Sequence, residues 1–107
     1  MGSCYLAPMR VIAKRTLREF WESKPQYADA EDPLAAWHAV CIRAVWKGPS
    51  DVKETFRSAS FVKRNVVFNI AGNKYRIVAN ISYSRQALFV KFIGTHKQYD
   101  AVDVGSL

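Results

Sequence analysis

Three side chains that can carry or orient a proton lie close together near the end of the sequence: His96, Tyr99 and Asp100. An imidazole, with an unperturbed pKa near ~6.5, can accept or donate a proton at neutral pH. A phenol, whose free pKa is about 10, does so only beside cations that lower its pKa, and it can instead stack on an unpaired base. A carboxylate here can orient the histidine or cap the terminal turn, and we expect the capping role.

Positive charge dominates the second half of the chain. The net charge is +7, and the stretch between Glu54 and Asp100 contains eight basic residues and no acidic one. A field of one sign attracts a polyanion, and the planar guanidinium of arginine matches the oxygens of a phosphate. A solvated basic surface without a partner is the alternative. The basic residues of this stretch are Arg57, Lys63, Arg64, Lys74, Arg76, Arg85, Lys91 and Lys97.

These residue types suit one reaction that needs no metal, the cleavage of RNA by its own 2′-hydroxyl. That reaction needs a base for the 2′ proton, cations that offset charge on the transition state, and an acid for the leaving 5′-oxygen. Each candidate also has a structural use: Arg76 as an exposed strand arginine, His96 as a loop histidine bonded to backbone, and Tyr99 as a packing residue at the sheet edge. The residue types alone make a nuclease attractive without establishing one.

Several other functional classes lack their signatures. The sequence has no glycine-rich phosphate loop, no paired carboxylates in one segment, no metal-ligand cluster and no recognisable Ser/His/Asp arrangement. Cys4 and Cys41 form no disulfide framework, and we expect both to be reduced thiols. No apolar run approaches the ~20 residues of a membrane span, and the N-terminus lacks the core of a signal peptide. We expect a cytoplasmic protein with no cofactor, no metal and no membrane contact.

The first hairpin of the predicted sheet can be placed from its turn. Residues 72–73, glycine and asparagine, lie between two runs of strand-forming residues and match a type II′ turn. That turn pairs Phe68 with Ile77 and Asn69 with Arg76. Because side chains alternate between the two faces of a strand, this register gives one apolar face and one polar face.

A second turn, centred on Arg85 and Gln86, would continue the same two faces into a third strand. The polar face would then bring basic and amide side chains of all three strands together. The predicted pairs are Ile81–Val90 and Ala79–Phe92 on the apolar face, and Asn80–Lys91 and Arg76–Thr95 on the polar face.

The residues before this sheet predict short helices. The capping-box pattern at Thr16 starts a helix that ends near Ser23, Asp29 or Asp32 caps a second helix, and Ser50 caps a third over residues 51–57. Short strands are expected at residues 10–13 and 61–62. The fold class is α+β: a small two-layer fold in which an N-terminal strand and helices pack on one face of an antiparallel sheet. We expect residues 1–8 to be an extension, either a tag remnant or a disordered leader, and residues 9–107 to form a single domain.

Two motifs are specific in combination: Phe68-Asn69-Ile70-Ala71-Gly72-Asn73-Lys74-Tyr75-Arg76 and Thr95-His96-Lys97-Gln98-Tyr99-Asp100. They are preceded by Met9-Arg10-Val11-Ile12, Leu17-Arg18-Glu19-Phe20-Trp21 and Pro33-Leu34-Ala35-Ala36-Trp37. In this order and separation, the segments resemble the HigB family of toxin-antitoxin toxins, within the wider RelE-like group. The likeness spans residues 9 to about 103 and leaves residues 1–8 outside.

The resemblance implies a RelE-like fold and a metal-independent endoribonuclease, an mRNA interferase that cuts mRNA in the A site of the translating ribosome and so inhibits translation. It also implies neutralisation by a cognate HigA-like antitoxin with a helix-turn-helix DNA-binding domain. Carried onto this chain, Arg76 would stabilise the phosphate, and His96 and Tyr99 would be the acid and the base, in an order that stays open. The implied RNA-binding residues are Lys74, Asn80, Lys91, Lys97 and Arg64.

Two other functions fit the same residues. The first is a non-catalytic RNA- or ribosome-binding module that uses the same basic face; RNA binding without strand scission would favour it. The second is a structural partner that only binds the antitoxin and sets its occupancy on DNA. Formation of the antitoxin complex without any RNA binding would favour that role.

Overall fold

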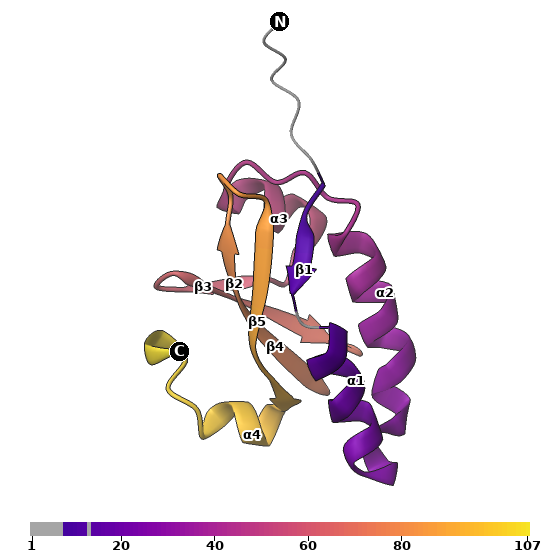
Figure 1. The fold of residues 1–107 in the computed structure, drawn as a ribbon. Helices are drawn as coiled ribbons and strands as arrows, with labels where there is room; N and C mark the ends of the chain where they lie inside the picture. Colours follow the sequence, from indigo (N-terminus) through magenta and orange to yellow (C-terminus); the bar gives the residue numbers. More distant parts are fainter. Residues whose placement is uncertain (1–7, 13) are drawn as a thin grey trace, which may run out of the picture.

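The structure is a computed structural model that describes residues 8–12 and 14–107 (Figure 1). Its helices and one mixed sheet confirm the predicted α+β class. Most of the extension expected at residues 1–8, and the last residue of the strand expected at 10–13, lie outside the described residues. The elements are β1 (Arg10–Ile12), α1 (Lys14–Ser23), the 3-10 helix η1 (Pro25–Ala30), α2 (Glu31–Cys41), α3 (Pro49–Thr55), β2 (Ser60–Val62), β3 (Asn65–Ile70), β4 (Tyr75–Ser82), β5 (Ala87–Thr95), α4 (His96–Asp100) and the 3-10 helix η2 (Val104–Ser106).

The strands lie in the order β1-β5-β4-β3-β2. Strands β2 to β5 form an antiparallel meander, whereas β1 pairs with β5 in parallel, with Arg10 opposite Ala87. The short strand predicted at residues 61–62 is confirmed as β2. Helices α1 and α2 pack on one face of the sheet, and α4 and the residues after it lie against the other face (Figure 1).

The predicted first hairpin is confirmed. Asn69 pairs with Arg76 and Phe68 with Ile77, and the turn is centred on residues 72–73. The N–H group of Lys74 donates to the carbonyl of Ala71 across this turn, at 3.3 Å. The first central residue of the turn is glycine with φ +75°, a backbone conformation that glycine adopts without steric cost. A local turn signal was therefore enough to fix this register.

The predicted register of the second hairpin is wrong. Ser82 pairs with Ala87 and Ile81 with Leu88, so the loop covers residues 83–86 and is centred one residue earlier than expected. Further along, the pairing of β4 with β5 is interrupted by a bulge at Lys91. A bulge inserts one extra residue into one strand and reverses the alternation of the side chains beyond it.

The bulge changes which residues face which side of the sheet. Ala79 pairs with Val90 as part of the main core, but Phe92 pairs with Val78 on the opposite face, and Arg76 pairs with Gly94 instead of Thr95. Because β5 has two adjacent apolar residues at 92–93, the bulge allows both to be partly buried, one on each face. Hydrophobic alternation alone could not show this.

The three predicted helix caps are also wrong. Helix α1 begins two residues before Thr16, and α3 already contains Ser50 and ends two residues before the predicted boundary at 57. Helix α2 continues directly from η1, and the N–H group of Glu31 donates to the carbonyl of Ala28, so this helix start needs no side-chain cap. Asp32 lies in the first turn of α2, and Asp29 makes contacts outside the helix.

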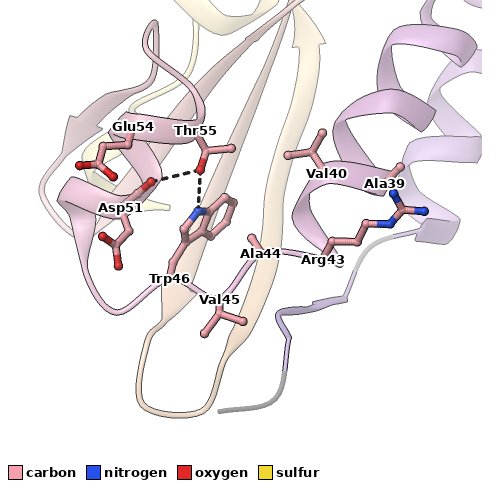
Figure 2. Close-up of a pocket in the computed structure, with 9 residues that line it drawn as sticks. All are labelled: Ala39, Val40, Arg43, Ala44, Val45, Trp46, Asp51, Glu54 and Thr55. Carbon is pink, nitrogen blue, oxygen red and sulfur yellow. Dashed lines mark hydrogen bonds between the residues drawn. The ribbon is translucent and has the colours of Figure 1, made fainter. Parts of the chain in front are cut away.

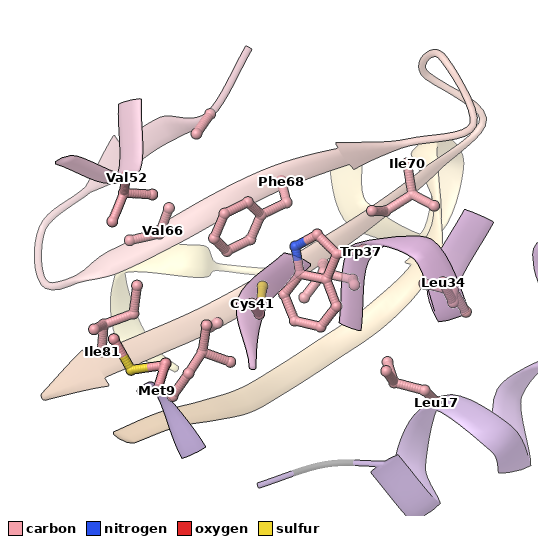
Figure 3. Packing of buried hydrophobic residues seen from close by; sticks show 14 of the residues in the cluster. Met9, Leu17, Leu34, Trp37, Cys41, Val52, Val66, Phe68, Ile70 and Ile81 are labelled. Atoms are coloured by element: carbon pink, nitrogen blue, oxygen red, sulfur yellow. The ribbon is translucent and has the colours of Figure 1, made fainter. Parts of the chain in front are cut away.

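The main core lies between the sheet and the layer of α1 and α2 (Figure 3). The ring of Phe68 in β3 meets the rings of Trp37 at 5.3 Å and Phe56 at 5.2 Å, both in edge-to-face arrangements that favour aromatic pairs. Cys41 is fully buried beside this cluster, and burial raises the pKa of its thiol. The thiol therefore stays protonated and unreactive at neutral pH.

A second, smaller cluster covers part of the opposite face of the sheet. Val67 of β3 and Val78 of β4 are buried there by Val104 of η2, and Tyr99 and Phe92 pack at the margin. The polar face predicted from the alternation is therefore partly covered by the C-terminal segment. This segment carries α4 and holds it beside the first hairpin.

A buried amide anchors the C-terminal segment. The side chain of Asn65, which has no exposed surface, donates to the carbonyl of Val104 at 2.9 Å and contacts the carbonyl of Leu107 at 3.4 Å. A buried carbonyl that loses its donor costs about 1–3 kcal/mol. Asn65 therefore ties residues 104–107 to the start of β3.

We expect Asn65→Ala to lower the free energy of unfolding by about 1–3 kcal/mol, because it leaves the carbonyl of Val104 without its donor. Urea unfolding followed by circular dichroism measures the change. The control is Asn69→Ala on the same strand, a half-buried amide, which should shift stability by no more than about 0.5 kcal/mol. An equal loss in the two variants would contradict the anchoring role.

Candidate active site

Helix α4 is held at the end of β5 by a capping box. The Thr95 hydroxyl accepts from the N–H group of Gln98 at 3.1 Å, and the Gln98 side-chain oxygen accepts from the N–H group of Thr95 at 2.8 Å. The next N–H group, that of His96, donates to the carbonyl of Lys74 at 3.3 Å. Together these bonds tie α4 to the turn of the first hairpin, so the sequence motif at 68–76 and the motif at 95–100 meet.

Gly94 makes this close approach possible. A Cβ atom at this position would lie 2.7 Å from the side-chain oxygen of Gln98 and 2.7 Å from the ring of Phe92. Its strand partner is Arg76. The absence of a side chain at Gly94 therefore lets α4 fold back beside β5 next to Arg76.

Arg76 and Tyr99 lie in direct contact. The central carbon of the guanidinium is 4.6 Å from the centre of the Tyr99 ring, within the range of a cation–π interaction. A terminal nitrogen of Arg76 also donates to the side-chain oxygen of Asn73 at 3.2 Å. These two contacts orient a half-buried guanidinium over a phenol, and both groups can contact an anionic ligand.

His96 and Asp100 pair one helical turn apart in α4. The imidazole Nδ1 lies 3.2 Å from a carboxylate oxygen of Asp100. This distance favours an orienting role for Asp100 over the capping role that we expected from the sequence. A carboxylate on one imidazole nitrogen fixes the ring and leaves the other nitrogen for proton transfer.

The residues predicted to bind RNA are placed differently from one another. Lys74 forms an ion pair with Asp29 across the fold, and Asn80 donates to the carbonyl of Arg64 at 3.1 Å and so ties β4 to the turn before β3. The side chains of Arg64, Lys91 and Lys97 are exposed. Lys91 is the bulged residue of β5.

Sequence reasoning missed two parts of this site. The Thr95–Gln98 capping box has a recognisable local signal, the same pattern that we assigned to a helix start at Thr16. The contacts of Asp29 have no local sequence signal, because Asp29 and Lys74 lie 45 residues apart in the sequence. Asp29 also accepts a hydrogen bond from the hydroxyl of the buried Tyr75 at 2.5 Å. The hydrogen bond from Lys74 is the main cause that lowers the pKa of the Asp29 carboxyl.

We expect Asp29→Asn to strengthen RNA binding, because it releases Lys74 for a phosphate while an amide oxygen can still accept from Tyr75. One additional phosphate contact steepens the dependence of log K on log salt by about 0.7 for a single strand. Fluorescence anisotropy of a labelled RNA across a salt series measures this slope. If the same gain persists when Asp29→Asn is combined with Lys74→Met, the released lysine is not its cause.

Two further observations concern residues 8–12 and 14–107 as a whole. No helix in this part of the chain is long and apolar enough to cross a membrane. The same residues contain no group of three or more His, Cys, Asp or Glu side chains that could hold a metal ion.

Comparison with known proteins points to one family. Residues 30–102 match the model of a family described as HigB_toxin, RelE-like toxic component of a toxin-antitoxin system. The chain is 28% identical over 95 aligned residues to the mRNA interferase toxin HigB of Escherichia coli strain K12. The alignment covers 86% of this chain and 88% of that protein. The mRNA interferase HigB proteins of Escherichia coli O157:H7 and Shigella flexneri match with the same identity and coverage.

Proposed function

This chain belongs to the HigB family of RelE-like toxins, and on that premise we propose that it is an mRNA interferase, an endoribonuclease that cuts mRNA on the translating ribosome. The observation that carries the proposal is that Arg76 contacts Tyr99 of α4, the short helix that also carries the His96–Asp100 pair. This set provides a phosphate-binding cation and two proton carriers.

The reaction that these groups support is transesterification. A base removes the proton of the 2′-hydroxyl, the 2′-oxygen forms a bond to phosphorus, and the bond from phosphorus to the 5′-oxygen breaks as an acid protonates that oxygen. The products are a 2′,3′-cyclic phosphate and a 5′-hydroxyl. We assign the two proton transfers to His96 and Tyr99, and the offset of transition-state charge to Arg76. Every step uses side chains of the protein alone.

The partners follow from the same premise. A toxic component of a toxin-antitoxin system has a cognate antitoxin. We propose a HigA-like antitoxin with a helix-turn-helix domain, and a substrate in the ribosomal A site. The exposed Arg64, Lys91 and Lys97 then contact the phosphates of mRNA or of ribosomal RNA.

The test is cleavage of a defined mRNA on programmed ribosomes, with cut ends mapped by primer extension. Discrete cuts inside codons at the A site, retained after EDTA treatment and absent with free mRNA, support a metal-independent and ribosome-dependent nuclease. Binding of folded wild-type protein to ribosomes without cuts would instead support the non-catalytic module. An antitoxin complex without binding to RNA or ribosomes would leave the structural-partner role.

A further inference from the structure

A surface groove lies on the other side of α4 from the His96–Asp100 pair. It is an open depression with a volume of about 490 Å³. One wall comes from the end of α1 and from η1, and the other from α4 and the turn after it. The residues used below are Phe20, Lys24, Tyr27, Phe92, Gln98 and Ala101.

The floor of the groove is an open strand edge. The pairing of β1 with β5 ends at Ile12 and Phe89, so from Val90 onwards the outer edge of β5 has no strand partner among residues 8–12 and 14–107. Backbone N–H and C=O groups along such an edge can bond to a ligand. Phe92 and Ile93 of this unpaired stretch line the groove, together with apolar side chains from the elements on either side.

The chemistry of the groove suits a nucleobase joined to a phosphate. Phe92 and Phe20 provide aromatic surface, and the ammonium of Lys24, 6.0 Å from the ring centre of Tyr27, provides a positive charge at the rim. Among residues 8–12 and 14–107, no acidic side chain lines this groove. Single-stranded RNA is held in this way, by base contacts with apolar and aromatic side chains and by phosphate contacts with cations.

A second depression of similar volume, about 540 Å³, also has an aromatic ring, that of Trp46, and a cation, but it differs in the acidic side chains that line it (Figure 2). It lies between the end of α2 and α3, and two carboxylates, those of Asp51 and Glu54, line it together with Arg43. Carboxylates at this density repel a phosphate chain. The contrast singles out the groove beside α4, and it provides a matched control surface.

The groove is connected to the candidate active site through Gln98. The side-chain nitrogen of Gln98 donates to the Tyr27 hydroxyl at 3.3 Å, and the side-chain oxygen belongs to the capping box that holds α4. The hydroxyl of Tyr27 thus accepts from Gln98 and keeps its own proton for another acceptor. A base seated in the groove would touch the same short helix that carries His96 and Tyr99.

We propose that this groove is a nucleobase subsite, which holds a base of the bound RNA strand at a distance from the cleaved phosphodiester and contacts it through the Tyr27 hydroxyl. The proposal rests on the proposed RNA-cleaving function for its substrate class. Binding of a nucleotide at this groove can nevertheless be measured separately from RNA cleavage.

The test uses binding of short 2′-O-methyl RNA, which has no free 2′-hydroxyl and is not cleaved. A photoreactive 4-thiouracil is placed at each position in turn, and crosslinked peptides are identified by mass spectrometry. We expect one position to crosslink to the segment around Tyr27 or Phe92. Ala101→Trp, which fills the groove from an exposed position, should reduce this crosslink at least tenfold, whereas Ala39→Trp in the acidic depression should not.

Crosslinks confined to the Arg76 side of α4, or an unchanged crosslink in folded Ala101→Trp, would overturn the subsite. The subsite would also be overturned if hydrogen exchange showed that the antitoxin protects the groove and that RNA does not. Crosslinking at the groove by a wild-type protein that makes no cuts on ribosomes would support the subsite while refuting the nuclease.

A second variant tests the reading of the base. Tyr27→Phe keeps the ring stacked on Phe20 and removes only the hydroxyl. We expect the preference among bases at the crosslinked position to fall about fivefold, the effect of one hydrogen bond. Equal preference in the two proteins would show that this hydroxyl does not read the base.

Discussion

Arg76→Ala is expected to lower the rate of mRNA cleavage by about 10²- to 10³-fold, the loss that follows removal of one preorganised donor to a developing charge. The guanidinium is held in place by Tyr99 and Asn73 before any substrate binds. Its contribution should therefore be made mainly in the transition state, so kcat should fall by much more than the affinity for ribosomes.

Arg76→Lys and Arg85→Ala are the informative companions of this variant. Lysine keeps the charge but loses the planar fork and much of the contact with the Tyr99 ring, so we expect an intermediate rate. Arg85 is an exposed arginine in the loop at the opposite end of β4, and its replacement should leave the rate within about twofold. Equal rates for Arg76→Ala and Arg85→Ala would remove Arg76 from the site.

His96→Ala is expected to lower the cleavage rate by about 10²- to 10⁴-fold, the range for loss of one general acid or base. Tyr99→Phe should have an effect in the same range and keeps the ring beneath Arg76, so the comparison isolates proton transfer from packing. Single-turnover rates on ribosomes between pH 5 and pH 10 measure both.

The same pH series separates the two roles. A base is needed in its deprotonated form and an acid in its protonated form, so each variant should lose one limb of the pH–rate profile. The limb missing from His96→Ala belongs to the imidazole. Asp100→Asn should reduce the rate by less than His96→Ala does, because Asp100 acts by orienting His96. Wild-type profiles in both Tyr99→Phe and His96→Ala would mean that neither residue transfers a proton.

Local signals account for the parts of the fold that the sequence predicted. The Gly72-Asn73 turn fixed the first hairpin because the backbone of two residues determines the register of both strands. The second hairpin has no such signal, and the bulge at Lys91 depends on burial at both faces of β5, which only the folded chain reveals. The start of α2 was missed because η1 continues into it and the N–H group of Glu31 bonds to the carbonyl of Ala28, so no side-chain cap marks it.

The candidate site was predictable as residue types and not as contacts. The acid-free basic stretch and the motif at 95–100 gave Arg76, His96 and Tyr99, but nothing in the sequence indicated that the guanidinium lies on the phenol ring. The pairing of Lys74 with Asp29 was equally hidden, since it depends on how η1 packs against the first hairpin. Long-range contacts of this kind follow from the packing of layers.

The parallel pairing of β1 with β5 also determines when the protein can fold. Arg10 must wait for Ala87, 77 residues later in the sequence, and pairings between such distant residues make folding slow. During synthesis the β3–β4 hairpin can form as soon as it emerges, whereas β1 stays unpaired until β5 has left the ribosome. Because α4 follows β5 directly, the chain that is still being translated has no assembled site. A toxin with this topology can assemble its candidate site only after both β5 and α4 have left the ribosome.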